Sequence, residues 1–459
     1  MNLKIHPLWI LACLGGLAFP STGAGQAGWK AGAAKAVITP AEPVWMAGYA
    51  GRDGPSDGAL TDIHARVLAL ADSGNRRLVM VSLELIEIPA TLRARLIRKA
   101  RDSHGLGPDE LLLNVSHTHG GPMLSAATIA DWGVDAAWGA RAEAYADLVA
   151  ARVDAAIAQA LARMAPAAVS HSKARCGFAM NRRQRGPSGF RLGPNPDGAV
   201  DHEVPVLSVG APGKPPLALV FGYACHNTAL GPTRKINGDY AGFAMQQLEK
   251  DHPETVALFL AGCGGDQDPA PRRDEADARF NGRSLAMAVE AALAAGPAPL
   301  APSLAVSVAT CPLPFAPLPP RAEIEARARS GNGFVSRHAR NILARWPNPG
   351  DQPDDFPLPV QVANLGGNLL LVALGGEPMA DYALRLRREL AAPGRAVWVA
   401  GYSNLVSCYV PTRKVLEEGG YEGTEAVIYQ SLPGPFRAEI EESIIATALR
   451  QAAATSKNR

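Results

Sequence analysis

Short apolar runs alternate with longer stretches of helical periodicity from residue 66 onward. Runs of four to eight apolar residues bounded by turn signals are typical of buried strands, whereas a repeat of three to four residues indicates a helix. Strand-like runs occupy residues 67–71, 78–85, 110–115, 217–223, 255–261, 360–365, 369–374 and 396–400. Helix-like stretches occupy residues 91–101, 137–164, 241–250, 276–295, 379–390 and 435–454. The alternation predicts an α/β fold, a mixed β-sheet core flanked by helices.

Two segments interrupt this pattern. Residues 186–196 are rich in Gly, Pro and Arg, and residues 312–320 are punctuated by proline, so both are predicted to be surface loops. Neither is long enough, or flanked by sufficiently different sequence, to mark a domain boundary. We therefore expect residues 28–459 to form a single large domain.

The first 27 residues have the composition of an export signal. Residues 8–19 form an apolar run behind Lys4 and His6, and residues 20–27 supply the breaking and small residues of a cleavage site. The run is shorter than the ~20 residues that span a bilayer. Around Cys13 the sequence loosely resembles a lipoprotein signal, but the apolar run continues beyond it, which argues against lipid attachment. We expect an exported protein, periplasmic or secreted, whose signal peptide is removed.

Composition narrows the classes of function. The 459 residues include 45 basic and 43 acidic side chains, and 47% of the residues are hydrophobic. This excludes a largely disordered chain, and the absence of a basic block argues against nucleic acid as a partner. Five cysteines remain after the signal segment: Cys176, Cys225, Cys263, Cys311 and Cys408. Their number is odd, they include no CxxC pair, and the sequence does not determine which of them form disulfides. Neither a zinc ribbon nor a thioredoxin-like site is therefore indicated.

Several polar fragments follow predicted strands, at the positions where open α/β sheets usually bind ligands. In residues 114–122, His117 and His119 project to one side of extended chain before Gly-Gly-Pro forces a turn. Two such imidazoles can share a metal, or one can bind the metal while the other moves substrate protons. The plain alternative is a polar strand end, because short His-x-His sequences also arise by chance.

Other fragments follow later strands. A lone His226 there is more often a hydrogen-bonded core residue than a ligand, and Glu377 before a helix also suits the helix N-terminus. Asp266 and Asp268 either bind a cation, share acid–base work or form an acidic turn. A last fragment runs from residue 401 to Tyr409. Two histidines, a glutamate and further oxygen donors fit a catalytic zinc site better than calcium or a structural zinc site.

In this order, the fragments resemble the neutral/alkaline non-lysosomal ceramidase family, specifically its N-terminal catalytic domain. The likeness runs from residue 30 to about 430 and is far more specific as a set than in any one member. It is carried by residues 32–40, 46–49, 116–119, 181–182, 236–239, 263–266, 376–377, 401–404 and 421–423. The resemblance implies that residues 28–459 are the catalytic domain. Family members usually carry a further C-terminal β-sandwich domain, which we do not expect in this chain.

Carried over by motif, the resemblance also implies a zinc cofactor. The implied ligands are His117, His226, Glu377 and Tyr409, and zinc would polarise the substrate carbonyl or acidify a bound water. His119, Arg182 and Tyr421 match residues that surround the scissile amide in the family.

One departure from the family pattern concerns its Gly-Asp-x-Ser-Pro segment. Asp268 stands where the family has its serine. A hydroxyl there serves as a nucleophile, whereas a carboxylate suits a general base or an additional metal ligand. The change predicts a retained metal site with an altered substrate or mechanism.

The leading hypothesis is an exported zinc-dependent hydrolase that cleaves the amide of N-acyl sphingosine or a related N-acyl compound, with Asp268 or His119 as proton carrier. A first alternative keeps the metal but acts on a carbohydrate or cell-envelope compound by hydrolysis or elimination, where Arg182, Arg183 and Arg185 would suit an anionic substrate. A second alternative is a non-catalytic binding protein on a degenerate ceramidase fold. The expected partner is a small molecule or a lipid reached by peripheral membrane contact, with no nucleic acid and no obligate protein.

Overall fold

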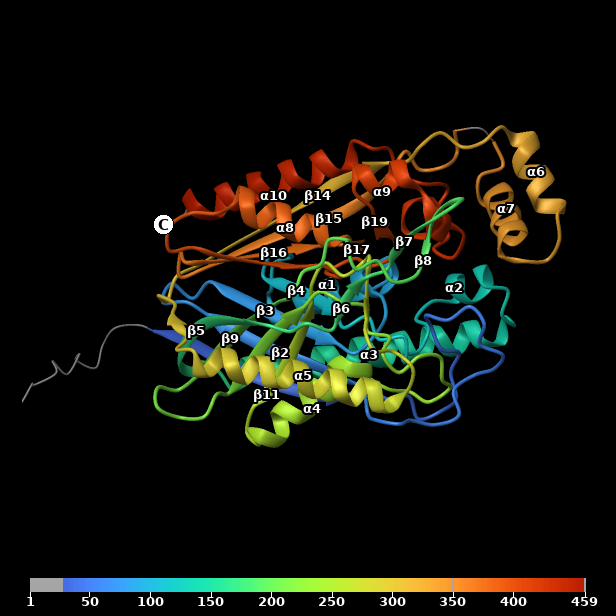
Figure 1. Ribbon diagram of the computed structural model, residues 1–459. Coiled ribbons are helices and arrows are strands. Elements are labelled where there is room, and N and C mark those ends of the chain that lie inside the picture. The colour runs from blue at the N-terminus through green and yellow to red at the C-terminus, as the bar shows by residue number, and fades with distance from the viewer. Residues whose placement is uncertain (1–27, 349, 458–459) are drawn as a thin grey trace, which may run out of the picture.

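The computed structural model describes residues 28–348 and 350–457, so the predicted signal segment lies outside the described residues. Two β-sheets are stacked on one another, and helices cover both outer faces (Figure 1). The prediction of an α/β fold with a mixed sheet core flanked by helices is confirmed. The predicted extent of one domain over residues 28–459 stays a prediction.

Within the described residues, the larger sheet has nine strands in the order β11-β10-β9-β5-β1-β2-β3-β4, with β13 paired to β5. It is mixed, because β3–β4 and β10–β11 are parallel while the other neighbours are antiparallel. Its strands are β1 (Trp29–Val37), β2 (His64–Ala71), β3 (Arg77–Leu83), β4 (Leu111–Val115), β5 (Ala165–Arg175), β9 (Glu203–Gly210), β10 (Ala218–Tyr223), β11 (Val256–Ala261) and β13 (Ala298–Pro299).

The second sheet consists of β14 (Leu304–Pro314), β15 (Asp355–Leu365), β16 (Leu369–Leu374) and β18 (Ala396–Ala400), in that order. Only the β16–β18 pair is parallel among these strands. Side chains alternate between faces along each strand. Leu258 of β11 and Leu371 of β16 therefore belong to the core between the sheets, whereas Phe259 and Val372 face the helices.

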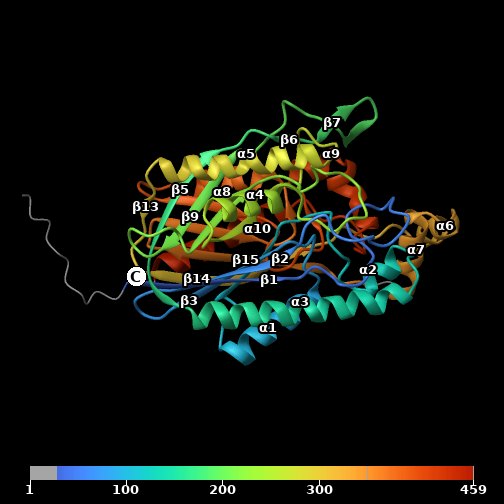
Figure 2. The same ribbon diagram turned by 90° about the horizontal axis from the view of Figure 1, so that it is seen from below.

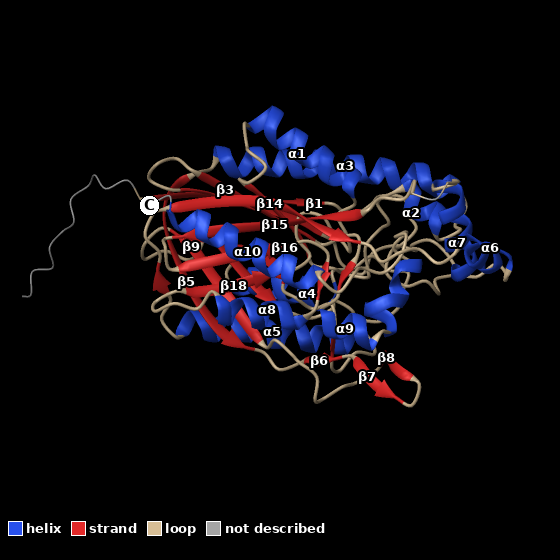
Figure 3. Ribbon diagram, turned by 90° about the horizontal axis from the view of Figure 1, so that it is seen from above, coloured by secondary structure: helices blue, strands red, loops and turns tan. Residues whose placement is uncertain are grey.

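Long helices bury the outer face of each sheet. On the larger sheet lie α3 (Ala137–Ala162), α4 (Asp239–Asp251) and α5 (Glu275–Ala294), with α1 (Ala90–His104) packed outside α3 (Figure 2). On the smaller sheet lie α8 (Ala380–Glu389) and α10 (Ile440–Lys457). A helical hairpin of α6 (Arg321–Arg329) and α7 (Phe334–Arg345) stands at one end beside α2 (Ala126–Asp131) (Figure 3). None of the helices in the described part combines the length and the apolar character that crossing a bilayer requires.

Two local predictions differ from the structure. Residues 186–196, expected as a loop, include part of an exposed hairpin of β7 (Arg183–Gly186) and β8 (Gly189–Leu192), whose turn uses the positive φ of Gly189. Residues 312–320 begin inside β14 and become irregular only after Pro314. All five cysteines that the structure describes are buried free thiols.

The carboxyl ends of several strands meet at one edge of the sheets, so the polar fragments that follow these strands also lie at this edge. Isolated β-bridges join Thr118 to Asn227 and Asn114 to Ser403, so the segments after β4, β10 and β18 lie side by side. Two short pairs complete the edge: β6 (Ala179–Asn181) with β12 (Gln267–Pro269), and β17 (Glu377–Pro378) with β19 (Tyr409–Val410). This edge is therefore where separate parts of the chain converge.

Candidate metal centre

Side chains from four separate segments meet at this edge of the sheets. The Glu377 Oε2 atom lies 3.1 Å from His117 Nε2 and 3.4 Å from His226 Nε2. The Tyr409 hydroxyl lies 3.2 Å from His226 Nε2, and the β17–β19 register places Glu377 directly opposite Tyr409. The Glu377 carboxylate and the Tyr409 hydroxyl thus both lie close to His226 Nε2, and Glu377 also lies close to His117 Nε2.

Backbone carbonyls orient the two imidazoles. His117 Nδ1 lies 2.7 Å from the Ile86 carbonyl, and His226 Nδ1 lies 2.8 Å from the Gly264 carbonyl. Each ring therefore donates its Nδ1–H to a carbonyl, which leaves the Nε2 lone pair facing the centre. Glu377 Oε2 finds no hydrogen-bond donor among the described residues although it is buried. Two lone pairs and a buried carboxylate oxygen directed at one point suit a bound metal cation.

Protonation states agree with this arrangement. Burial, followed by the nearby charge of Arg182, lowers the pKa of His226 to about 4, which keeps the imidazole neutral. Burial opposes ionisation of Glu377, but the positive charge of His117 and hydrogen bonds from the His117 and His226 rings outweigh burial and hold its pKa well below the usual range, so a proton on these rings and a metal cation are alternative partners of the ionised carboxylate. Neutral imidazoles and an ionised carboxylate are the forms that bind metals.

His119 lies beside the same point. Its Nε2 is 3.4 Å from His117 Nε2, and the His117, His119 and His226 rings together form a group able to hold a metal ion. Unlike the other two rings, His119 has a buried Nδ1 without a hydrogen-bond partner among the described residues. Burial and the neighbouring His117 hold the pKa of His119 well below its ordinary value. Its ring packs on Gly48, whose φ of +98° and missing side chain leave room for it.

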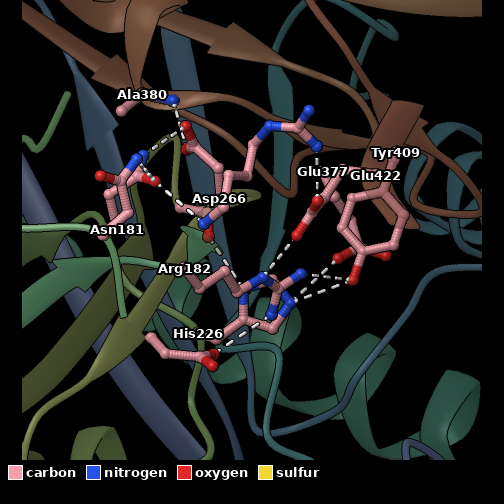
Figure 4. Close-up of polar contacts among 12 residues, drawn as sticks. Asn181, Arg182, His226, Asp266, Glu377, Ala380, Tyr409 and Glu422 are labelled. Atoms are coloured by element: carbon pink, nitrogen blue, oxygen red, sulfur yellow. Dashed lines mark hydrogen bonds and ion pairs between the residues drawn. The ribbon is translucent and has the colours of Figure 1, made fainter. Parts of the chain in front are cut away.

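Arg182 ties the centre to the rest of the edge (Figure 4). Its guanidinium donates to the Tyr409 hydroxyl at 3.0 Å, to Glu422 at 2.8 Å and to Asp268 at 3.1 Å. Arg183 is held by Glu422 as well, at 2.8 Å. Because these groups are buried, the network fixes the position of the Tyr409 hydroxyl rather than leaving a mobile cation.

Asp268 is bridged between two arginines. One carboxylate oxygen accepts from Arg182, and the other accepts from Arg272. Burial would raise the pKa of Asp268, but the two guanidinium groups outweigh burial and lower it. A carboxylate stabilised in this way is a weak base.

Comparison with known protein families identifies the family of this chain. The sequence model of the neutral/alkaline non-lysosomal ceramidase N-terminal domain matches residues 29–272, more than half of the chain. The chain belongs to this ceramidase family. A search of curated proteins found no match.

Two solved ceramidase structures share the fold of this family member. The neutral ceramidase from Pseudomonas aeruginosa superposes with a TM-score of 0.74 at 18% identity, covering 94% of this chain and 75% of the other. A ceramidase complexed with C2 gives a TM-score of 0.73 at 18% identity, covering 94% of this chain and 76% of the other. At this identity the likeness establishes the fold.

Two cavities flank the centre of this ceramidase-family chain. The first has a volume of about 370 Å³ and is lined by His117 and Glu377, and the second has a volume of about 530 Å³ and is lined by Asp268 and Arg272. Four residues line both cavities: Gly48, His119, Tyr409 and Tyr421. The predicted residue Tyr421 opens a π-helical turn at residues 421–425, and its ring centroid lies 5.6 Å from that of Tyr409.

Asp266 does not share the centre with Asp268. Its carboxylate accepts from the Ala380 N–H at 2.9 Å and from Asn181 at 3.1 Å, so it anchors the start of α8. Burial raises the pKa of Asp266 to about 6. The two carboxylates that the sequence grouped together thus have different partners.

Sequence reasoning missed two further acids of the site. Glu422 holds both Arg182 and Arg183, and only its place beside the quoted Tyr421 hinted at it. Glu87 lines the first cavity with a buried Oε1 that lacks a partner among the described residues. Burial and then the charge of Glu377 raise the pKa of Glu87 to about 7. No local sequence signal marks Glu87, because its surroundings come from distant parts of the chain.

Proposed function

We propose that this ceramidase-family chain is a zinc-dependent hydrolase that cleaves the amide of an N-acyl compound, with N-acyl sphingosine as the first substrate to test. The observation that carries the proposal is the convergence of His117, His226 and Glu377, with Tyr409 beside them, on one point at a cavity. Two imidazoles and a carboxylate form the ligand set of many catalytic zinc sites. Family membership and a structural neighbour complexed with C2 also support the proposal.

Zinc held by these residues would stabilise negative charge that develops on the substrate carbonyl oxygen. The protein's part is to keep the donors in place before substrate arrives. The carbonyls of Ile86 and Gly264 fix the imidazoles, and Arg182 fixes the Tyr409 hydroxyl. Fixed donors need no reorganisation during the reaction, which lowers its barrier.

Of the two proton carriers expected from the sequence, we favour His119. Its Nδ1 is not committed to an acceptor, so the ring is free to change which nitrogen carries the proton. It also lines both cavities beside the metal centre, where a substrate and a water would meet it. Asp268 is held by two guanidinium groups, which fits a residue that positions Arg182 and Arg272.

The carbohydrate alternative receives little support from the arginines. Arg183 is paired with Glu422 and Glu418, and Arg185 lies on the exposed β7–β8 hairpin. Within the described residues, none of the three arginines that the sequence suggested for an anionic substrate, Arg182 included, therefore presents a free guanidinium group to either cavity.

The test is release of fatty acid from N-acyl substrates by purified protein loaded with zinc. The proposal expects turnover of at least one N-acyl amide and at least a hundredfold loss in His119→Ala, the typical contribution of a positioned acid–base group being 10²–10⁴-fold. His171→Ala, a histidine on β5 away from the centre, is the matched control. Turnover of acidic saccharides without any of N-acyl amides would favour the carbohydrate alternative, and turnover of neither would favour a binding protein.

We also propose export, with residues 1–27 as a cleaved signal and residues 28–459 as the catalytic domain. The apolar run and small residues of this segment support the proposal. Mass spectrometry of the protein recovered from the periplasm or medium tests it, since the mature chain should begin near residue 28. Recovery of the intact chain from the cytoplasm alone would refute it.

A further inference from the structure

The second cavity has a charged group that the proposed reaction does not use. Much of its wall is apolar, formed by Met180, Leu192, Pro194, Pro269 and Pro271. The charged side chains in its lining are two arginines and one aspartate, Arg182, Arg272 and Asp268. The cavity wall therefore has one more positive than negative charge.

The two arginines differ in how far their hydrogen-bonding capacity is satisfied. Arg182 is buried and uses Nε, Nη1 and Nη2 on Glu422, Asp268 and Tyr409. The Arg272 side chain is 38% exposed, and its guanidinium contacts Asp268 through Nη1 alone among the described residues. A guanidinium has five N–H donors. Arg272 therefore presents unused donors and charge at the cavity.

Asp268 positions Arg272 in relation to the metal centre. The carboxylate links Arg272 to Arg182, and Arg182 contacts the Tyr409 hydroxyl beside His226. Only a few side chains would therefore separate a ligand group on Arg272 from the reacting bond. His119 and Tyr421 border both cavities, so one substrate can extend from the centre into the second cavity.

We propose that the second cavity binds a carboxylate of the substrate on Arg272, so that the substrate is an N-acyl compound with an acidic group near the cleaved amide, such as an N-acyl amino acid. This inference rests on the proposed amide hydrolysis and specifies its substrate class. A carboxylate entering an apolar wall loses its hydration, and a charge-assisted bidentate contact with arginine compensates for that loss. A neutral hydroxyl in the same place gains much less.

The test compares binding of two uncleavable ligands to zinc-loaded protein by isothermal titration calorimetry. They are the ketone analogues of N-lauroylglycine and N-lauroylethanolamine, in which CH₂ replaces the amide NH, so they differ only in carboxylate against hydroxymethyl. We expect the wild type to bind the acid about tenfold or more tightly than the alcohol, the range of hydrogen bonds to charged groups. Arg272→Gln should bring this ratio close to one, and Arg272→Lys should retain part of it.

Arg273→Gln is the matched control, because Arg273 is 75% exposed and pairs with Asp277 rather than with a cavity residue. It should keep the wild-type ratio. Equal binding of both ligands by the wild type, or an unchanged ratio in Arg272→Gln, would overturn the inference. Hydrolysis of the two parent amides is measured in parallel. Absence of fatty acid release from both parent amides and from N-acyl sphingosine would refute the proposed function, whereas the binding ratio decides on the carboxylate site independently.

Discussion

The substitution Gly48→Ala tests whether His119 moves protons or holds the metal. A methyl group at position 48 would lie 2.5 Å from His119 Cγ and 2.6 Å from its Nδ1. Carbon atoms pack at about 3.5–4.0 Å, so the imidazole must move by roughly 1 Å. The φ of +98° adds a backbone strain of about 1–3 kcal/mol for any residue with a side chain.

A displacement of ~1 Å at a catalytic group typically costs ~10²-fold in rate, equivalent to about 3 kcal/mol in the activation barrier. We therefore expect kcat for the best N-acyl amide to fall about a hundredfold in Gly48→Ala. Bound zinc should stay at the wild-type level, because His117, His226, Glu377 and Tyr409 are not touched.

The assay combines kcat and KM with zinc content and a urea unfolding curve. Gly51→Ala is the matched control in the same loop, since a methyl group there meets no atom within 4 Å and Gly51 has no positive φ. It should keep wild-type kcat. Unchanged kcat in Gly48→Ala would refute the role of His119, and loss of zinc would instead make His119 a ligand.

Three further predictions concern acids of the fold and the site. In rate measurements, Asp268→Asn should retain more than about a tenth of kcat, because Asp268 positions arginines rather than accepting protons. A loss of ~10²–10⁴-fold, as expected for a general base, would contradict this assignment. Burial raises the pKa of Asp266 to about 6, above the ordinary ~3.9. The neutral acid therefore contributes its full share of the folding stability below pH ~4, and this share is lost as pH rises through about 6. Asp266→Asn should remove roughly 3 kcal/mol of this pH-dependent decline in urea unfolding curves, and parallel curves for variant and wild type between pH 4 and 7 would count against it. Buried Arg66 pairs with the buried Glu84, which also faces the His64 ring. Arg66→Met should cost about 3–5 kcal/mol in the same assay, and the double variant with Glu84→Gln should recover part of this loss. A double variant no more stable than Arg66→Met would contradict this prediction.

Strands buried on both faces could be predicted from the sequence. Strands β10, β11, β16 and β18 read as uninterrupted apolar runs because helices cover one face and the other sheet covers the second. Strands β1, β5, β9 and β14 were missed. In β5 and β14 many side chains are partly exposed, and the sequences contain polar and small residues. Their place in the sheets depends on pairing with distant strands, which local periodicity does not encode.

The site shows the same division. His117 and His226 were candidates because they follow buried strands, and strand ends of one sheet gather at a common edge. The sequence could not show that Asp266 faces α8 while Asp268 faces the cavity, because the partners of the two carboxylates come from different parts of the chain. The bridge from Arg182 to Glu422 joins residues 240 positions apart. Contacts of this range come from the tertiary fold.

The zinc content of the purified chain tests the central claim most directly. The protein is loaded with zinc, dialysed against metal-free buffer and analysed by inductively coupled plasma mass spectrometry. We predict about one zinc per chain for the wild type and for His171→Ala, and less than roughly one tenth for His226→Ala with a retained fold, since catalysis of this kind requires its metal. Wild-type protein that retains less than roughly one tenth of a zinc, or His226→Ala that retains a full equivalent, would contradict the account.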